Sequence, residues 1–283
     1  PFMAPCFGTI ARIARGNGHT KVLCQIDNVE PHEHHLTDKP FNRYYLHSVD
    51  GFVYMSEQVH SELRAYSDAP ALFSPHPLFE NFGERVERSE ACVRLGLDPA
   101  NRYVLFFGLI RDYKGLDLLL DAWAQLRRAG RTEGRRLIVA GEFYTAREPY
   151  LNRIADNGLQ DEVLLHDRFI PDDDVKYYFS AADFVVQPYK TATQSGVTQI
   201  AYQFCVPMVV TKVGGLAEIV PDGRVGYVCE PTPEGVAGAI ERMYEGDTLQ
   251  RFRENCVEER RRFSWEEMCS RITELYGLVA SGK

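Results

Sequence analysis

The feature that most constrains the fold is a strand, a glycine turn and a helix start that follow one another along the chain. The run Tyr103 to Phe107 is continuously apolar, as in a strand whose two faces are both buried in a parallel sheet. Gly108 ends this run. Beyond it, large apolar residues recur at helical spacing, namely Leu116, Leu119, Leu120 and Trp123. The pattern predicts one strand-turn-helix unit of a parallel α/β sheet.

The turn of this unit carries two cations, Arg111 and Lys114, beside the expected helix start. The first N–H groups of a helix lack partners inside the helix, and the helix dipole favours an anion there. We therefore expect the turn to bind a phosphate or diphosphate group. The alternative is an ordinary turn with two solvated cations.

Composition limits the classes of function. The chain has 283 residues, 45% of them hydrophobic, which predicts a globular protein of about two domains. A net charge of −8 argues against a nucleic-acid partner, because such proteins usually present a basic face. Seven cysteines without a close pair, together with no signal-peptide pattern, favour the cytoplasm. No apolar run approaches the roughly 18 residues of a membrane span.

Strand-like runs alternate with helical patterns along the chain, which predicts parallel α/β sheets. The expected strands are Val22 to Ile26, Phe52 to Met55, Tyr103 to Phe107, Arg136 to Ala140, Val163 to Leu165, Phe184 to Gln187 and Met208 to Thr211. Ser74 to Glu87 has two prolines and no periodicity, so we interpret it as a linker. We expect domains at 1–79, 80–263 and 264–283. The first holds too few strands to be complete, and we expect the natural polypeptide to begin upstream.

A second candidate site follows the expected strand that ends at Gln187. The loop carries Thr193, Gln194 and Ser195, and Gly196 opens a helix with Val197 behind it. Glycine and small polar residues let a ligand approach the backbone, whose N–H groups bind phosphate oxygens. Both loops leave the carboxyl ends of strands, where ligands of open α/β sheets bind. The alternative is simple helix capping by Thr193 or Ser195.

The C-terminal helix has a capping-box signature, in which Ser264 caps the first turn and Glu267 reaches back. We expect Trp265 to anchor its start. The predicted buried stripe consists of Met268, Ile272, Leu275 and Val279. This segment is expected to pack back toward the first domain.

The N-terminal part contains a polar segment, Asp27 to Asp38, directly after a strand. Within it, Glu33 lies next to His32, where it can orient that imidazole or polarise a hydroxyl group. A metal site built from Glu33, His32, His34 and His35 is the competing interpretation. Side chains packed so closely on one loop cannot all converge on one ion, so we favour a solvated loop over metal.

Five segments in this order resemble glycosyltransferase family 4, over roughly residues 50 to 276. They are FFGLIRDYKGLDLLLDAW, LIVAGEF, FIPDDDVKYYFSAADFVVQPY, SGVTQIAYQFCVPMVVTKVGGLAEIV and FSWEEM. The resemblance implies the α/β fold called GT-B, with two Rossmann-like doubly wound parallel-sheet domains, of which the N-terminal one is incomplete here. It also implies a retaining glycosyltransferase of hexosyltransferase type that needs neither a metal nor a cofactor.

By the same resemblance, Arg111 and Lys114 correspond to the family's diphosphate-binding pair and have a catalytic role in stabilising the leaving group. Phe169 and Ile170 lie where the nucleobase rests, and Glu142 follows the family's glycine turn, which lacks its second glycine here. The full set of expected donor-binding residues is Gly108, Arg111, Lys114, Glu142, Phe169, Ile170, Thr193, Gln194, Ser195, Gly196, Val197 and Gln199.

The sequence departs from the family at a pair of glutamates that normally contact the donor sugar and ribose. Alignment on Pro207 places Ile200 at the second glutamate and Ala192 or Thr193 at the first. Gln199, beside Ile200, can hydrogen-bond ribose hydroxyls without charge. The loss puts sugar contacts in question more than phosphate binding.

On the acceptor side, the resemblance makes His32 the candidate for the catalytic histidine near the transferred sugar, although Asp27 occupies the more usual position. Asn28, Glu30 and His32 are expected to face the acceptor, and Glu33 completes the catalytic set. We expect transfer from a nucleotide sugar to a saccharide or lipid-linked acceptor, in the cytoplasm or peripherally at the inner face of the plasma membrane. The alternatives are a GT-B nucleotide-sugar epimerase and a non-catalytic nucleotide-sugar-binding protein.

Overall fold

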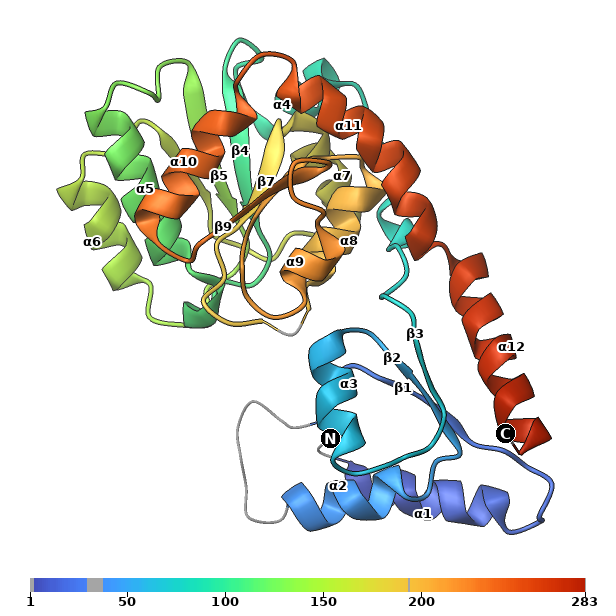
Figure 1. Cartoon of the computed structure of the whole chain (residues 1–283). Helices are drawn as coiled ribbons and strands as arrows, with labels where there is room; N and C mark the ends of the chain where they lie inside the picture. The colour runs from blue at the N-terminus through green and yellow to red at the C-terminus, as the bar shows by residue number, and fades with distance from the viewer. Residues whose placement is uncertain (1–2, 30–37, 193, 283) are drawn as a thin grey trace. The chain divides into compact units, whose positions relative to one another are not determined.

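The computed structural model describes residues 3–29, 38–192 and 194–282, and its contacts divide the chain into two compact units (Figure 1). The smaller unit combines Pro1–Pro77 with Arg262–Lys283. The larger unit is Leu78–Arg261. The C-terminal segment therefore belongs to the same unit as the beginning of the chain.

The larger unit is built on a six-stranded parallel sheet in the order β6-β5-β4-β7-β8-β9. Its strands are β4 (Arg102–Phe107), β5 (Arg135–Ala140), β6 (Val163–His166), β7 (Phe184–Gln187), β8 (Met208–Thr211) and β9 (Gly226–Cys229). Its helices are α4 (Arg88–Leu95), α5 (Leu116–Arg128), α6 (Glu148–Asp156), α7 (Asp172–Ala181), α8 (Gly196–Gln203), α9 (Leu216–Ile219), α10 (Pro233–Met243) and α11 (Thr248–Glu259).

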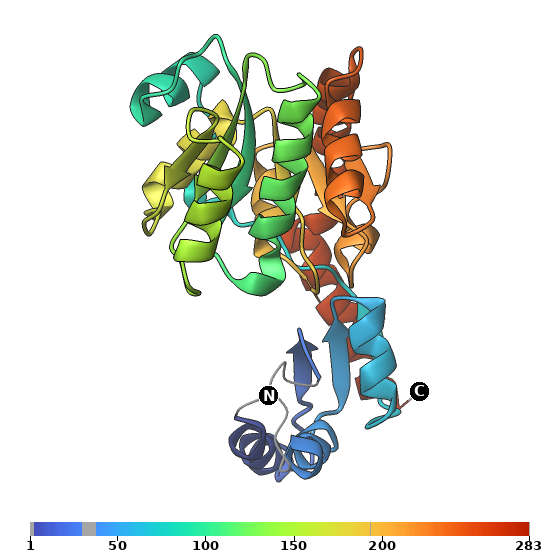
Figure 2. The ribbon, with the colours of Figure 1, turned by 90° about the vertical axis from the view of Figure 1, so that its left-hand side faces the viewer.

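Helices cover both faces of this sheet. Helices α5, α6 and α10 lie on one face, which Figure 2 turns toward the viewer, and α4, α7 and α8 lie on the other. The buried core includes Phe106 and Trp123, whose indole Nε1 donates to Glu162 at 2.8 Å. The predicted strand at 103–107 and the predicted stripe on α5 are both confirmed.

The strand order reverses at β4. The chain runs from β4 outward through β5 to β6, and then returns to place β7 on the other side of β4. Neighbouring loops from such a reversal leave a space between them at the carboxyl ends of the strands, because they turn in opposite directions. The loops after β4 and β7 therefore frame this position.

The smaller unit contains a three-stranded parallel sheet, β1 (Leu23–Ile26), β2 (Gly51–Tyr54) and β3 (Ala71–Phe73). Its helices are α1 (Ala4–Arg15), α2 (Asp38–Leu46), α3 (Glu57–Arg64) and α12 (Trp265–Ser281). Helix α12 packs against β2 through an apolar cluster that contains Val53, Met55, Met268, Leu275 and Val279.

The predicted cap of α12 is confirmed in part, because the Ser264 hydroxyl accepts a hydrogen bond from the N–H of Glu267 at 3.1 Å. One residue of the predicted buried stripe, Ile272, is wrong, and Trp265, which was expected to anchor the helix start, is exposed. Ile272 is 38% exposed and Trp265 is 51% exposed. Helical spacing gave the direction of the buried face, since Met268, Leu275 and Val279 are all buried.

The linker interpretation of Ser74 to Glu87 fits a segment whose only regular element is a short 3-10 turn at Glu80–Phe82.

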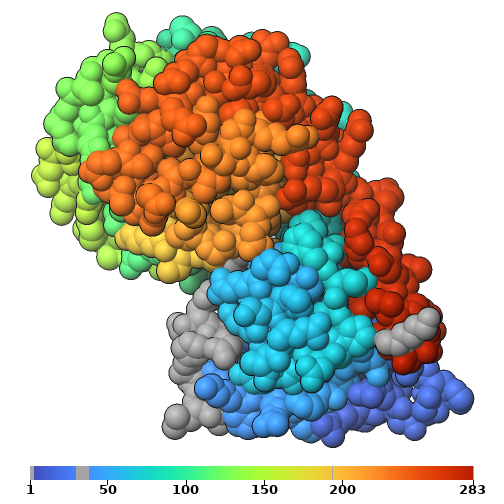
Figure 3. Space-filling model, in the orientation of Figure 1, coloured from blue at the N-terminus to red at the C-terminus, as the bar shows by residue number. Residues whose placement is uncertain are grey.

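The segment after β9, coloured orange to red in Figure 3, covers much of the visible face of the larger unit. The seven cysteines are free; Cys92 and Cys256 are buried, whereas Cys6 and Cys269 are exposed. Among the described residues, no helix is both long and apolar enough to cross a membrane.

Candidate functional site

The loops after β4 and β7 meet at Gly108, the first residue beyond β4. Gly108 has a φ of +98°, and a Cβ placed there would lie 3.2 Å from the Nζ of Lys114 and 3.5 Å from a methyl group of Val197. Lys114 belongs to the first loop and Val197 to the first turn of α8. The structure thus brings together three of the residues expected to bind the donor.

Close backbone contacts fix the two loops against each other. A Cβ on Gly115, whose φ is +69°, would lie 1.9 Å from the carbonyl oxygen of Pro188. The N–H of Lys190 donates to the carbonyl of Tyr113 at 2.7 Å. Only glycine fits at position 115, because the loop after β7 occupies the space of a side chain.

Lys114 is half-buried, and its surroundings favour loss of its proton. Burial, and secondarily the positive charge of Arg111, lower the pKa of Lys114 to about 8. Its Nζ lies 5.8 Å from the centre of the Tyr189 ring. A bound anion would offset both unfavourable effects, so this lysine is suited to hold a negative ligand.

Arg111 is exposed and lies over Tyr144 in the loop after β5, with its guanidinium carbon 5.2 Å from the ring centre. Within the described part of the chain, neither Arg111 nor Lys114 forms an ion pair. The two cations are close enough for Arg111 to lower the pKa of Lys114, yet no acidic side chain of the described residues pairs with them.

The nearest carboxylates have other partners. Asp112 accepts hydrogen bonds from Thr145 at 2.8 Å and Tyr150 at 3.0 Å, and these bonds lower its pKa. Asp117 pairs with Lys190 at 2.6 Å. These contacts hold both carboxylates away from the cations that the sequence singled out.

Two helices, α5 and α8, begin in the loops of this site. The sequence predicted a helix start near Lys114, but α5 begins at Leu116 and carries Asp117 in its first turn. Helix α8 has no acidic residue in its first turn. A negative side chain already occupies the dipole end of α5, whereas the corresponding end of α8 is available.

The N-cap of α8 is Ser195, and its hydroxyl does not cap the helix. Its Oγ lies instead 3.1 Å from the Tyr189 hydroxyl. Within the described residues, the N–H groups of Gly196 and Val197 have no acceptor. The capping alternative for Ser195 is therefore wrong, and no described residue occupies these two donors. Thr193, the other candidate cap, lies outside the described residues.

Three glutamines surround the end of β7 and the start of α8, and each has a buried amide atom without a hydrogen-bond partner. Gln187 accepts from Thr198 at 3.1 Å but leaves its Nε2 unsatisfied. Gln194 also has an unsatisfied Nε2. Gln199 is 1% exposed, with both Nε2 and Oε1 unsatisfied. Because these atoms are covered, a ligand would reach them only after neighbouring side chains move.

The remaining expected donor residues lie on the other side of β4. Glu142 follows β5, its carbonyl accepts from the N–H of Ile110 at 2.8 Å, and its side chain is exposed. Phe169 and Ile170 follow the edge strand β6. Phe169 is 66% exposed, while Ile170 is buried. These three residues share the carboxyl edge of the sheet with Lys114.

The expected acceptor-side residues Glu30 and His32 and the expected catalytic residue Glu33 lie outside the described residues, as does the metal alternative built on His32, Glu33, His34 and His35. Asn28 is described: it follows β1, is half-buried, and its Oδ1 has no hydrogen-bond partner. No cluster of three or more potential metal ligands occurs in residues 3–29, 38–192 and 194–282.

Sequence reasoning missed Tyr189 and Tyr144, the aromatic rings beside the two cations. Their places in the loops after β7 and β5 were the available signal, since loops at the carboxyl ends of parallel strands lie on the ligand side of the sheet.

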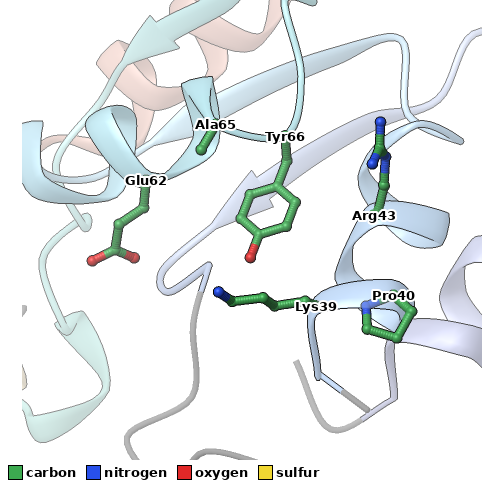
Figure 4. A pocket seen from close by; sticks show the side chains of 6 residues that line it. All are labelled: Lys39, Pro40, Arg43, Glu62, Ala65 and Tyr66. Atoms are coloured by element: carbon green, nitrogen blue, oxygen red, sulfur yellow. The ribbon is translucent and has the colours of Figure 1, made fainter. Parts of the chain in front are cut away.

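A separate hollow of about 740 Å³ lies between α2 and α3 of the smaller unit (Figure 4). Lys39 reaches toward the hydroxyl of Tyr66, whereas Arg43 extends away from both. Glu62, which also lines the hollow, accepts a hydrogen bond from Gln58 at 3.1 Å. The charged groups do not converge on one point, so these side chains do not indicate which class of ligand the hollow would bind.

The sequence profile of the family described as glycosyl transferases group 1 matches residues 101–246, which hold all the strands of the larger sheet and the loops just described. The chain belongs to this family. A curated group 1 relative, D-inositol 3-phosphate glycosyltransferase 2 of Catenulispora acidiphila, is 31% identical over 245 residues, or 81% of this chain and 56% of the relative.

A second relative, D-inositol 3-phosphate glycosyltransferase of Pseudarthrobacter chlorophenolicus, is 31% identical over 144 residues, or 50% of this chain and 34% of its own length. The chain thus spans about half the length, or less, of these curated group 1 relatives.

Solved structures agree on the fold. Anabaena Alr3699/HepE in complex with UDP aligns with a TM-score of 0.78 at 18% identity, covering 97% of this chain and 76% of that one. Sucrose-phosphate synthase from Thermosynechococcus elongatus aligns with a TM-score of 0.77 at 20% identity, covering 98% and 72%. The predicted GT-B fold, with two parallel-sheet α/β domains, is confirmed.

Proposed function

We propose that this group 1 chain binds a nucleoside-diphosphate sugar and transfers its sugar, with retention of configuration and without a metal, to a hydroxyl group of a saccharide or lipid-linked acceptor. The observation that carries the proposal is the arrangement at Gly108. There, a half-buried ammonium that forms no ion pair among the described residues and the N-terminus of α8, which no described side chain caps, border the same point. Two such groups match the charge of a diphosphate.

The chemistry follows from this arrangement. When the bond between the sugar and the β-phosphate breaks, the phosphate oxygen takes the electron pair, and the acceptor hydroxyl attacks the sugar carbon and passes its proton to that departing phosphate oxygen. Lys114, Arg111 and the N–H groups of Gly196 and Val197 would stabilise the charge that develops on the leaving diphosphate. Gln199 would hydrogen-bond the ribose once its covering side chains move, since its amide has no partner of its own.

The proposed acceptor class rests on the names of the curated relatives. The two curated relatives are named for D-inositol 3-phosphate, a phosphorylated polyol, which belongs to the same broad class of hydroxyl acceptors as a saccharide. Action in the cytoplasm, with peripheral contact to the inner face of the plasma membrane, completes the proposal.

A turnover assay tests the proposal. The protein is incubated with a panel of nucleoside-diphosphate sugars and polyol, saccharide or lipid-linked acceptors, and the released nucleoside diphosphate is measured. Release that requires both donor and acceptor supports glycosyl transfer. Donor binding without release under any condition would favour a non-catalytic nucleotide-sugar-binding protein, which the replacement of a family glutamate by Ile200 makes the second candidate.

The lowered pKa of Lys114 predicts how binding depends on pH. The ammonium form binds the anion, so affinity falls as pH rises through a pKa of about 8. Between pH 7 and 9 the dissociation constant for a nucleoside diphosphate should rise about tenfold, while the ligand's own charge stays constant. Lys114→Arg is the control, because a guanidinium stays protonated and should flatten the profile. Titration calorimetry at each pH measures both. An affinity that stays constant across this range in the wild type would contradict the assignment.

A further inference from the structure

Tyr189 lies directly after β7 and contacts both groups that are proposed to hold the diphosphate. Its side chain is buried, with 3% of the residue exposed. The ring centre is 5.8 Å from the Nζ of Lys114, and the hydroxyl is 3.1 Å from the Oγ of Ser195. One residue thus connects the cation of the first loop with the N-cap of α8.

The contact with Ser195 reaches the N-cap of α8. A serine at the N-cap normally accepts a hydrogen bond from an N–H of the first turn. Here the Ser195 hydroxyl is engaged by Tyr189, and the N–H groups of Gly196 and Val197 stay without an acceptor in the described structure. The contact therefore ties the Tyr189 hydroxyl to the end of α8 that carries these N–H groups.

The contact between the Tyr189 ring and Lys114 favours one position of the Lys114 ammonium group. The negative face of an aromatic ring attracts an ammonium within about 6 Å of its centre. A half-buried lysine lacks much of its hydration and forms no ion pair among the described residues, so the ring is a main interaction that directs it. Tyr189 thereby favours a position of Nζ beside Gly108.

Tyr189 is itself held from several sides. Its carbonyl accepts a hydrogen bond from Thr211 at the end of β8, at 2.6 Å. Its ring meets the ring of Tyr113 edge-on, with centres 6.0 Å apart. Tyr113 is also joined to this loop through the N–H of Lys190. A residue fixed in this way can set the distance between two other groups.

We propose that Tyr189 is a positioning residue, which sets the spacing between the Lys114 ammonium and the N-terminus of α8 so that both engage one diphosphate. The proposal rests on the proposed function, since it assumes that these groups bind the donor. The two contacts of Tyr189 are separable by substitution. Tyr189→Phe keeps the ring and removes the hydroxyl, and Tyr189→Leu removes both.

The first arm of the test needs no ligand. In spectra of the protein labelled with 13C-lysine, the ring should displace the Lys114 side-chain resonances, and the displacement should persist in Tyr189→Phe and disappear in Tyr189→Leu. Unchanged Lys114 resonances in Tyr189→Leu would overturn the proposal, whether or not the protein binds nucleotides. This arm separates failure of the inference from failure of the proposed function.

The second arm measures binding of inorganic pyrophosphate, which does not depend on the identity of the base. Tyr189→Phe and Ser195→Ala should each weaken binding by about fivefold, in line with the loss of one hydrogen bond. In the double variant, binding should be weakened by much less than the product of the two single fold-changes, because both substitutions remove the same contact. Tyr189→Leu should weaken binding by about 30-fold or more. Orthophosphate, which cannot bridge the two groups, should respond less to each change.

Tyr103→Phe is the matched control, because Tyr103 is buried in the same unit and its hydroxyl donates to the carbonyl of Asp98 at 2.8 Å, near the opposite end of β4. It removes a buried tyrosine hydroxyl without touching either loop and should leave pyrophosphate binding unchanged. Equal weakening in Tyr103→Phe and Tyr189→Phe, or additive effects of Tyr189→Phe and Ser195→Ala, would overturn the positioning role.

Discussion

Replacing Lys114 with alanine should remove most of the thermal stabilisation that nucleoside diphosphates confer on this protein. At 100 times its dissociation constant, a ligand adds about 2.7 kcal/mol to the free energy of unfolding, or about 5 to 10 °C in the melting temperature of a unit of this size. Loss of a partly buried charged contact costs at least about 2 kcal/mol of binding free energy, or about 30-fold in affinity. At the same ligand concentration, less than about 1 kcal/mol of stabilisation would remain in Lys114→Ala.

Lys190→Ala is the matched control for this experiment. Lys190 lies in the facing loop, but its ammonium pairs with Asp117 at 2.6 Å, so it is not available to an added anion. Thermal scans with a panel of nucleoside diphosphates should show a normal shift for Lys190→Ala. A normal shift for Lys114→Ala would show that Lys114 does not hold the phosphates, and no shift for the wild type with any nucleotide would refute the donor site itself.

Gly115→Ala should destabilise the larger unit by several kcal/mol more than Gly96→Ala. The two glycines have nearly the same backbone conformation, with φ of +69° and +67°. At Gly96 a Cβ meets nothing within 4 Å, whereas at Gly115 it lies 1.9 Å from the Pro188 carbonyl oxygen. Gly96→Ala thus measures only the left-handed backbone, which costs about 1–2 kcal/mol. The difference between the variants measures the overlap of the two loops.

Urea unfolding followed by circular dichroism gives both free energies, and pyrophosphate titration shows the effect on the site. To remove the overlap, the loops must move apart, so Gly115→Ala should also weaken anion binding where it still folds, while Gly96→Ala should not. Equal stability of the two variants would mean that the loops separate freely, which is inconsistent with their serving as a fixed frame for a ligand.

Much of the fold could be predicted from the sequence, because buried parallel strands are continuous apolar runs. The strands around Phe106 and Val186 and the stripe on α5 are of this kind. Two strands were missed, β3 and β9. Each is short and begins with a small residue, Ala71 in β3 and Gly226 in β9. Each is held in an extended conformation by pairing with a neighbouring strand, β3 with β2 and β9 with β8. Sequence periodicity does not report such pairing.

The site was predictable where it depends on strand ends and less so where it depends on packing. Gly108, Lys114 and Val197 were expected on the carboxyl edge of the sheet, and the structure places them together. The choice between two helix ends was not predictable, since it depends on Asp117 lying inside the first turn of α5. The role of Tyr189 depends on contacts with residues of two separate loops, and such contacts exist only after folding.

The reversal of strand order at β4 has a mechanical consequence. Gly108 and Val197 are neighbours in space but belong to the two halves of the larger unit, one built on β4 to β6 and the other on β7 to β9. A diphosphate that spans them acts as a removable crosslink between these halves. Occupancy should therefore suppress their independent opening and slow amide exchange and proteolytic cleavage far beyond the residues that touch the ligand.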